Sequence, residues 1–174
     1  MKQENKPTNR RLSDGTSGTT AASAKVDFPP EPLKEWGKVM IGHWRSQPPA
    51  GAAAAEPEIH SSAQWILNNT ALQGEFQVGG ERGLWITVWN VESKQIEQRT
   101  VNSDGSTVFT IIKRQGDHWE WRQIALYPNG ENETSIDTVK VSSDGNTLEH
   151  NVSHRVRNGN RLPNIHSILN RASA

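Results

Sequence analysis

The chain has 174 residues, with 19 basic and 19 acidic side chains and no cysteine. This length suggests one domain with some additional chain. The neutral balance argues against a dedicated nucleic-acid binder and against a polybasic membrane anchor, because both need a basic surface. The lack of cysteine excludes disulfides, thiolate metal sites and a cysteine nucleophile.

The hydrophobic pattern limits the compartment and the class of fold. No apolar run approaches the ~20 residues of a membrane span, and the N-terminal region lacks the apolar segment of a secretory signal. We therefore expect a cytoplasmic protein without a membrane partner. Only 33% of the residues are hydrophobic, yet seven are tryptophan, which suits a thin-walled fold whose wall residues each have one side in water.

The N-terminal segments precede the main domain. Residues 1–28 are rich in Ser, Thr, Asn and Lys without apolar periodicity, which predicts a disordered leader. Residues 29–42 begin with prolines and place Leu33, Trp36 and Met40 at helical spacing before Gly42. This pattern predicts a short helix that plugs one end of the domain formed by residues 43–174.

From His43 onward the pattern predicts one strand after another. Segments such as ALQGEFQV, RGLWITVWNV and STVFTIIKR are separated by turn sequences such as NSDGS, YPNGEN and SSDGN. Asp-Gly and Asn-Gly pairs supply the positive φ angles of tight hairpins. The turns recur about every dozen residues with no helix between them, which predicts an all-β, up-and-down antiparallel meander of about ten strands.

A meander this wide favours a closed barrel over an open sheet. An open sheet of about ten strands would leave two long edges exposed, and closure removes both. A barrel of roughly eight to ten strands has an interior that side chains fill or that holds one small ligand. The proline-flanked segment Pro48–Pro57 predicts a loop, which we expect to act as a lid over the entrance.

Several segments, in their order along the chain, resemble those of a known group of barrels: Gly42-His43-Trp44, Trp65–Leu72, Gly83–Thr107, Trp119–Trp121, Ser142–Val156 and Arg171. The chain resembles the bacterial calycin-like barrels, a lipocalin-like group largely without assigned function, over residues 36–171.

The resemblance implies roles for two residues and one cofactor. In lipocalins the tryptophan of the G-x-W motif closes the barrel floor and an arginine of the last strand packs across it, which implies that Trp44 and Arg171 tie the barrel together. Nitrobindin-like barrels carry haem through a histidine, which would be His150 or His154 here. The two glycines that follow their G-x-W motif are missing from this chain, so we expect no cofactor.

Two histidines occupy one alternating row of the segment Asn146–Val156. Leu148, His150, Val152, His154 and Val156 share a face of an extended chain. On this pattern both imidazoles point inward. They are hydrogen-bonded members of the interior, polar contacts for a bound small molecule, or a haem ligand, metal ligand or general base. Their separation of about 13 Å along a strand prevents one metal from binding both without other strands.

The segment HWEW offers a second set of candidate residues. Trp119 and Trp121 share one face and are expected to line the interior, while His118 and Glu120 on the other face are expected to be solvated. The weaker alternative is a metal site that contains His118 and Glu120.

Two strands, GLWITVWNV and STVFTIIKR, show apolar residues on both faces. In GLWITVWNV, the first face holds Leu84, Ile86 and Val88, and the second holds Trp85 and Trp89. Either the N-terminal helix or tail covers the outer face, or a second subunit does so in a homodimer. In the strand between these two, Glu97 and Arg99 share a row, which is either an internal anchor for a carboxylate or, as we favour, an external charged surface.

No phosphate loop, nucleophile elbow or zinc-protease motif is present. We therefore expect a non-catalytic protein that binds a small hydrophobic or amphipathic ligand through His150, His154, Trp119 and Trp121. The alternatives are an isomerase- or cyclase-type enzyme that uses an interior histidine, and a haem-binding nitrobindin-like protein.

Overall fold

A computed structural model describes residues 28–46 and 57–172, so the expected leader and the expected lid lie, apart from their last residues, outside the described residues. One helix, α1 (Glu31–Met40), precedes the strands. In chain order the strands are β1 (Gly42–Ser46), β2 (Ile59–Ile66), β3 (Ala71–Val78), β4 (Glu81–Asn90), β5 (Gln95–Asn102), β6 (Thr107–Gln115), β7 (His118–Leu126), β8 (Asn132–Val141), β9 (Thr147–Arg157), β10 (Asn160–Arg161) and β11 (Ile165–Ala172).

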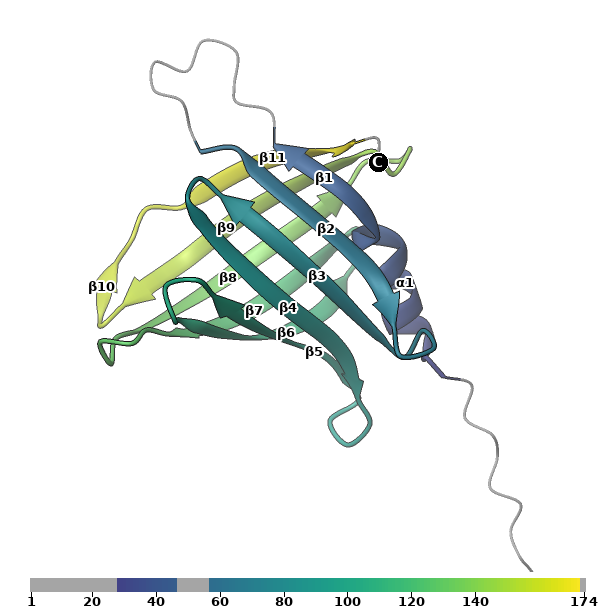
Figure 1. The fold of residues 1–174 in the computed structure, drawn as a ribbon, viewed down its shortest axis with the longest axis horizontal. Helices are drawn as coiled ribbons and strands as arrows, with labels where there is room; N and C mark the ends of the chain where they lie inside the picture. Colours follow the sequence, from purple (N-terminus) through teal and green to yellow (C-terminus); the bar gives the residue numbers. More distant parts are fainter. Residues whose placement is uncertain (1–27, 47–56, 173–174) are drawn as a thin grey trace, which may run out of the picture.

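The strands close into a barrel (Figure 1). Each strand from β1 to β9 pairs antiparallel with the next along the chain, and β11 completes the ring by pairing with β9 and β1. The two-residue β10 pairs only with β9, so ten strands form the wall. The prediction of a single up-and-down antiparallel barrel of about ten strands is confirmed, and this architecture is compatible with a calycin-like fold.

Helix α1 lies at one end of the barrel (Figure 1). Leu33, Trp36 and Met40 recur at the i, i+3, i+7 spacing of one helix face, and all three are buried. The ring of Trp36 packs 5.1 Å from that of Trp119 and 5.5 Å from that of Trp121, both on β7. This contact fixes the helix against the closed end of the barrel.

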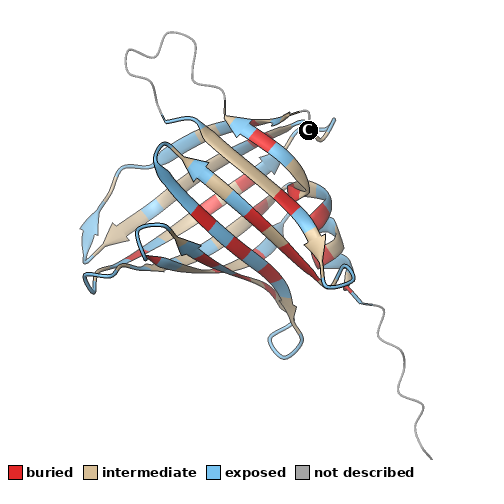
Figure 2. Ribbon diagram, in the orientation of Figure 1, coloured by how far each residue is buried: buried red, intermediate tan, exposed pale blue. Residues whose placement is uncertain are grey.

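The wall alternates between buried and exposed residues (Figure 2). On β4, Trp85 and Thr87 are buried inside, whereas the outer residues Leu84, Ile86 and Val88 remain 39–47% exposed. The helix therefore leaves this outer face uncovered. The expectation of a homodimer through it stays a prediction.

The charged row of β5 faces outward. Gln98 and Thr100 are buried inside the barrel, so their neighbours Glu97 and Arg99 lie on the outer face. The Arg99 guanidinium stacks 3.9 Å over the ring of Phe109 on β6. The external alternative is thus the one observed, and these two residues contribute nothing to the interior.

Candidate functional site

The barrel encloses a cavity of about 350 Å³. Its closed end is formed by Met40 of α1, and its walls come from every barrel strand except β1. The apolar part of the lining is the larger. It consists of Met40, Ile59, Phe76, Val78, Trp85, Val108, Trp121, Ala125, Val139, Leu148, Val152, Ile165 and Leu169.

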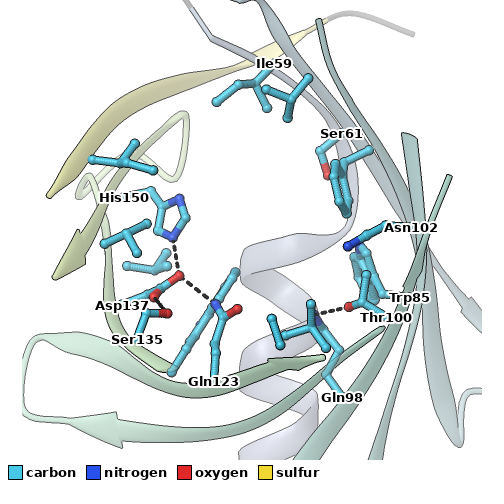
Figure 3. A pocket seen from close by; sticks show the side chains of 18 of the residues that line it. Ile59, Ser61, Trp85, Gln98, Thr100, Asn102, Gln123, Ser135, Asp137 and His150 are labelled. Carbon is cyan, nitrogen blue, oxygen red and sulfur yellow. Dashed lines mark hydrogen bonds and ion pairs between the residues drawn. The ribbon is translucent and has the colours of Figure 1, made fainter. Parts of the chain in front are cut away.

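A polar cluster centred on Asp137 lies on one wall of this cavity (Figure 3). Asp137 is buried, and its Oδ1 accepts a hydrogen bond from Ser135 Oγ at 2.9 Å. Its Oδ2 accepts one from Gln123 Nε2 at 2.6 Å and lies 2.9 Å from His150 Nε2. A buried carboxylate needs such donors to offset its loss of water. Three strands, β7, β8 and β9, supply them.

His150 extends from β9 toward the open space (Figure 3). Its ring packs 5.3 Å from that of Trp121, and its side chain retains 24% of its exposure although it lies inside the barrel. This exposed surface faces the cavity, because His150 is one of its lining residues. His150 and Trp121, both predicted site residues, are thus brought together on the same wall.

Trp119 lies outside the cavity lining. It is buried against Trp36 of α1. The prediction that it faces the interior is right, but the helix occupies the space that a ligand would need beside it. Trp119 belongs to the floor under the cavity.

His154 departs from the predicted row because β9 contains a bulge. Thr134 pairs with Val156 and Ile136 with Ser153, so β9 has one residue more than β8 between these pairs. His154 adopts a left-handed φ of 50° at this point, and its side chain is exposed. A bulge reverses the alternation of the residues that follow it. The prediction that His154 points inward is therefore wrong, and Arg155 lines the cavity in its place.

A second polar cluster lies toward the end opposite α1. Glu133 is buried, and its carboxylate accepts hydrogen bonds from Arg155 Nε at 2.9 Å, Arg157 Nε at 3.0 Å and the Tyr127 hydroxyl at 3.1 Å. The Arg157 guanidinium also stacks 4.2 Å over the Tyr127 ring. Burial raises the pKa of Glu133, but the hydrogen bonds from Arg157 and Arg155 outweigh it and hold that pKa below its usual value.

Trp44 and Arg171 meet at the seam where the first and last strands pair. They are register partners of β1 and β11, and the guanidinium lies 4.3 Å over the indole ring. Arg171 also donates hydrogen bonds to the carbonyls of Ile41 and Gly145, while the Trp44 Nε1–H donates to the carbonyl of Met40. These contacts connect α1, the seam and the β8–β9 turn.

The polar residues of β8 were not predicted from the sequence. Glu133, Ser135 and Asp137 face the interior, whereas the apolar Ile136 lies on the other face. The signal that could have found them is the register of the β7–β8 hairpin, which pairs Asp137 with Trp121 and Ser135 with Gln123. Because directly paired residues share a face, the inward tryptophan implies an inward aspartate.

The geometry gives little support to a bound metal or haem. In the described residues, no three His, Asp or Glu side chains are grouped so that they could hold a metal ion. The cavity also lies at the lower end of the roughly 300–1,000 Å³ range of small-molecule sites. These features argue against a histidine-ligated haem.

Comparison with known protein families and with curated proteins finds no match to this chain. Among the residues that the structure describes, no helix has both the length and the apolar character required to cross a membrane.

Proposed function

We propose that this protein, a barrel of the calycin-like kind, binds a small, largely apolar molecule with one polar end inside its cavity. The observation that carries the proposal is the composition of the cavity wall. Apolar side chains form the larger part of the lining, and polar groups lie on the β7–β8–β9 wall and on β5, where Gln98, Thr100 and Asn102 face the same cavity. This combination is typical of small-molecule sites, where the apolar lining supplies affinity and the polar groups fix orientation.

The cavity volume limits the ligand to compact molecules. About 350 Å³ suits a bicyclic or monoterpene-sized molecule better than a long extended chain. Trp85 and Trp121 line the space, so a ligand there changes their fluorescence. A titration with para-cymene, camphor and decanoate therefore tests both occupancy and size. We expect para-cymene and camphor to alter the emission at lower concentration than decanoate.

Two substitutions on β7 distinguish interior binding from binding elsewhere. Ala125 lines the cavity, whereas its neighbour Ile124 lies on the outer face and is exposed. Ala125→Trp fills the space and should abolish binding measured by calorimetry. Ile124→Trp adds the same ring outside and should leave binding unchanged. Circular dichroism verifies that both variants fold. Equal binding by both variants, or no binding of any probe by the wild type, contradicts the proposal.

The Asp137–His150 pair favours one second candidate function, an isomerase-type enzyme. A carboxylate that holds and orients an imidazole equips the histidine to accept and return a proton. An enzyme of this type would exchange carbon-bound hydrogens of its ligand with solvent. Incubation of bound ligands in deuterated water, followed by mass spectrometry, should show deuterium incorporation that is lost in His150→Phe. Ligands recovered without deuterium exclude this candidate among the compounds tested.

A further inference from the structure

The hydrogen bonds of Asp137 determine which nitrogen of His150 carries the proton. Both oxygens of this carboxylate are engaged, Oδ1 by Ser135 and Oδ2 by Gln123 and His150. An ionised carboxylate only accepts hydrogen bonds, so His150 Nε2, 2.9 Å away, must be the donor. In the neutral imidazole, the other nitrogen then bears a lone pair.

That other nitrogen, Nδ1, is available to a ligand. Within residues 28–46 and 57–172, no hydrogen bond joins Nδ1 to the protein. Figure 3 shows the imidazole projecting into the cavity, with the nitrogen bonded to Asp137 turned toward the wall. The nearest ring is Trp121, and the directly paired residue on β8 is Val139. The lone pair thus belongs to a residue that lines the cavity and is an acceptor without a partner among the described residues.

From this arrangement we infer that the ligand carries a hydroxyl or N–H group that donates a hydrogen bond to His150 Nδ1. The inference rests on the proposed function and specifies its ligand class: compact apolar molecules with one donor, such as phenols, alcohols or indoles. Asp137 already accepts three hydrogen bonds from the protein and is 2% exposed, so His150 Nδ1 is the more accessible acceptor of the two. A site with a buried acceptor disfavours an analogue that lacks the donor, since the acceptor is then left unpaired.

Matched ligand pairs test this inference. Indole and indene share a shape and differ by the N–H donor, and thymol and para-cymene differ by a hydroxyl. Calorimetry on the wild-type protein should show that the donor-bearing member of each pair binds roughly 2- to 10-fold more tightly, as expected for one net hydrogen bond. If both members of a pair bind with equal affinity, the inference is overturned and the proposed function stands. If neither pair binds, the proposed function fails as well.

Two histidine variants on the same strand provide the control. His150→Phe removes the acceptor but also frees Asp137 Oδ2, so it is combined with Asp137→Leu, and the two members of each pair should then bind equally. His154→Phe alters the exposed histidine beyond the bulge and should keep the wild-type preference. A preference that survives in this double variant overturns the inference.

A direct measurement on the wild type needs no substitution. Nitrogen-15 correlation spectra distinguish protonated from unprotonated imidazole nitrogens. We expect the His150 resonance in the neutral ring to show the proton on Nε2. A proton on Nδ1 instead would overturn the inference even if the double variant fails to fold.

Discussion

Replacement of Glu133 by Gln tests the polar cluster opposite α1. The substitution keeps the size of the side chain but removes the negative charge shared by Arg155 and Arg157. Removal of one partner from a fully buried ion pair costs about 3–5 kcal/mol, because the other charge is left without compensation. Arg157 is 37% exposed and recovers contact with water. We therefore expect a loss of about 2–4 kcal/mol in the free energy of unfolding.

Urea denaturation followed by circular dichroism measures this loss, and pH supplies a second test. The pKa of the Glu133 carboxyl group lies below its usual value in the folded protein. The carboxylate therefore contributes its full stabilisation when the pH is above the usual pKa, and this contribution is lost as the pH falls through the pKa of the folded protein. The difference between wild type and Glu133→Gln should therefore be largest near neutral pH and shrink below about pH 4.

The matched control is Glu120→Gln on the outer face of β7. Glu120 pairs with Arg122 at 2.8 Å, and the arginine is largely exposed. Exposed pairs contribute at most about 1 kcal/mol, so this variant should unfold close to the wild-type midpoint. Equal losses in Glu133→Gln and Glu120→Gln, or a Glu133→Gln loss that is constant from pH 3 to pH 7, would refute the reasoning.

Three other substitutions test the contacts that build the barrel. Trp36→Ala removes the buried ring that fixes α1 against β7 and should lower the free energy of unfolding by about 3–5 kcal/mol; a loss under 1 kcal/mol would mean that the helix contributes little. Gly74→Val places a Cβ within 2.1 Å of the Trp85 ring and 2.6 Å of the Ser62 carbonyl oxygen, so thermal unfolding should show a loss of about 1–3 kcal/mol, and an unchanged midpoint would contradict the close packing of β3 on Trp85. Arg171→Met keeps the apolar stem but loses the stacking on Trp44 and the bonds to two carbonyls; we expect a loss of about 1–2 kcal/mol in urea denaturation, and wild-type stability would show that the seam holds without this contact.

The fold was predictable because its main signals are local. Each Asp-Gly or Asn-Gly turn specifies a hairpin on its own, and a series of hairpins leaves two edges that closure removes. The helix was equally visible, since Leu33, Trp36 and Met40 mark one face within ten residues. Whether the outer face of β4 is covered could not be decided from the sequence, because an apolar row looks the same whether a helix, a subunit or solvent lies beside it.

The site was predictable only where alternation is regular. His150 and Trp121 were found because each lies on a part of its strand where side chains alternate regularly between the two faces. His154 was misplaced because the bulge that turns it outward depends on pairing with β8, and no glycine or proline marks it in the sequence. Asp137 was overlooked because its inward direction depends on the register of the β7–β8 hairpin, and its partners lie on three consecutive strands whose registers the sequence does not specify.

The position of a bound probe inside the barrel tests the account most directly. Isotope-filtered nuclear Overhauser spectra of the protein with thymol report which side-chain protons lie next to the ligand. The account predicts contacts to the rings of Trp121 and His150 and to the methyl groups of Val139 and Leu148, all of which line the cavity. Contacts confined to the exposed outer face of β4, or no intermolecular contacts at all, would contradict it.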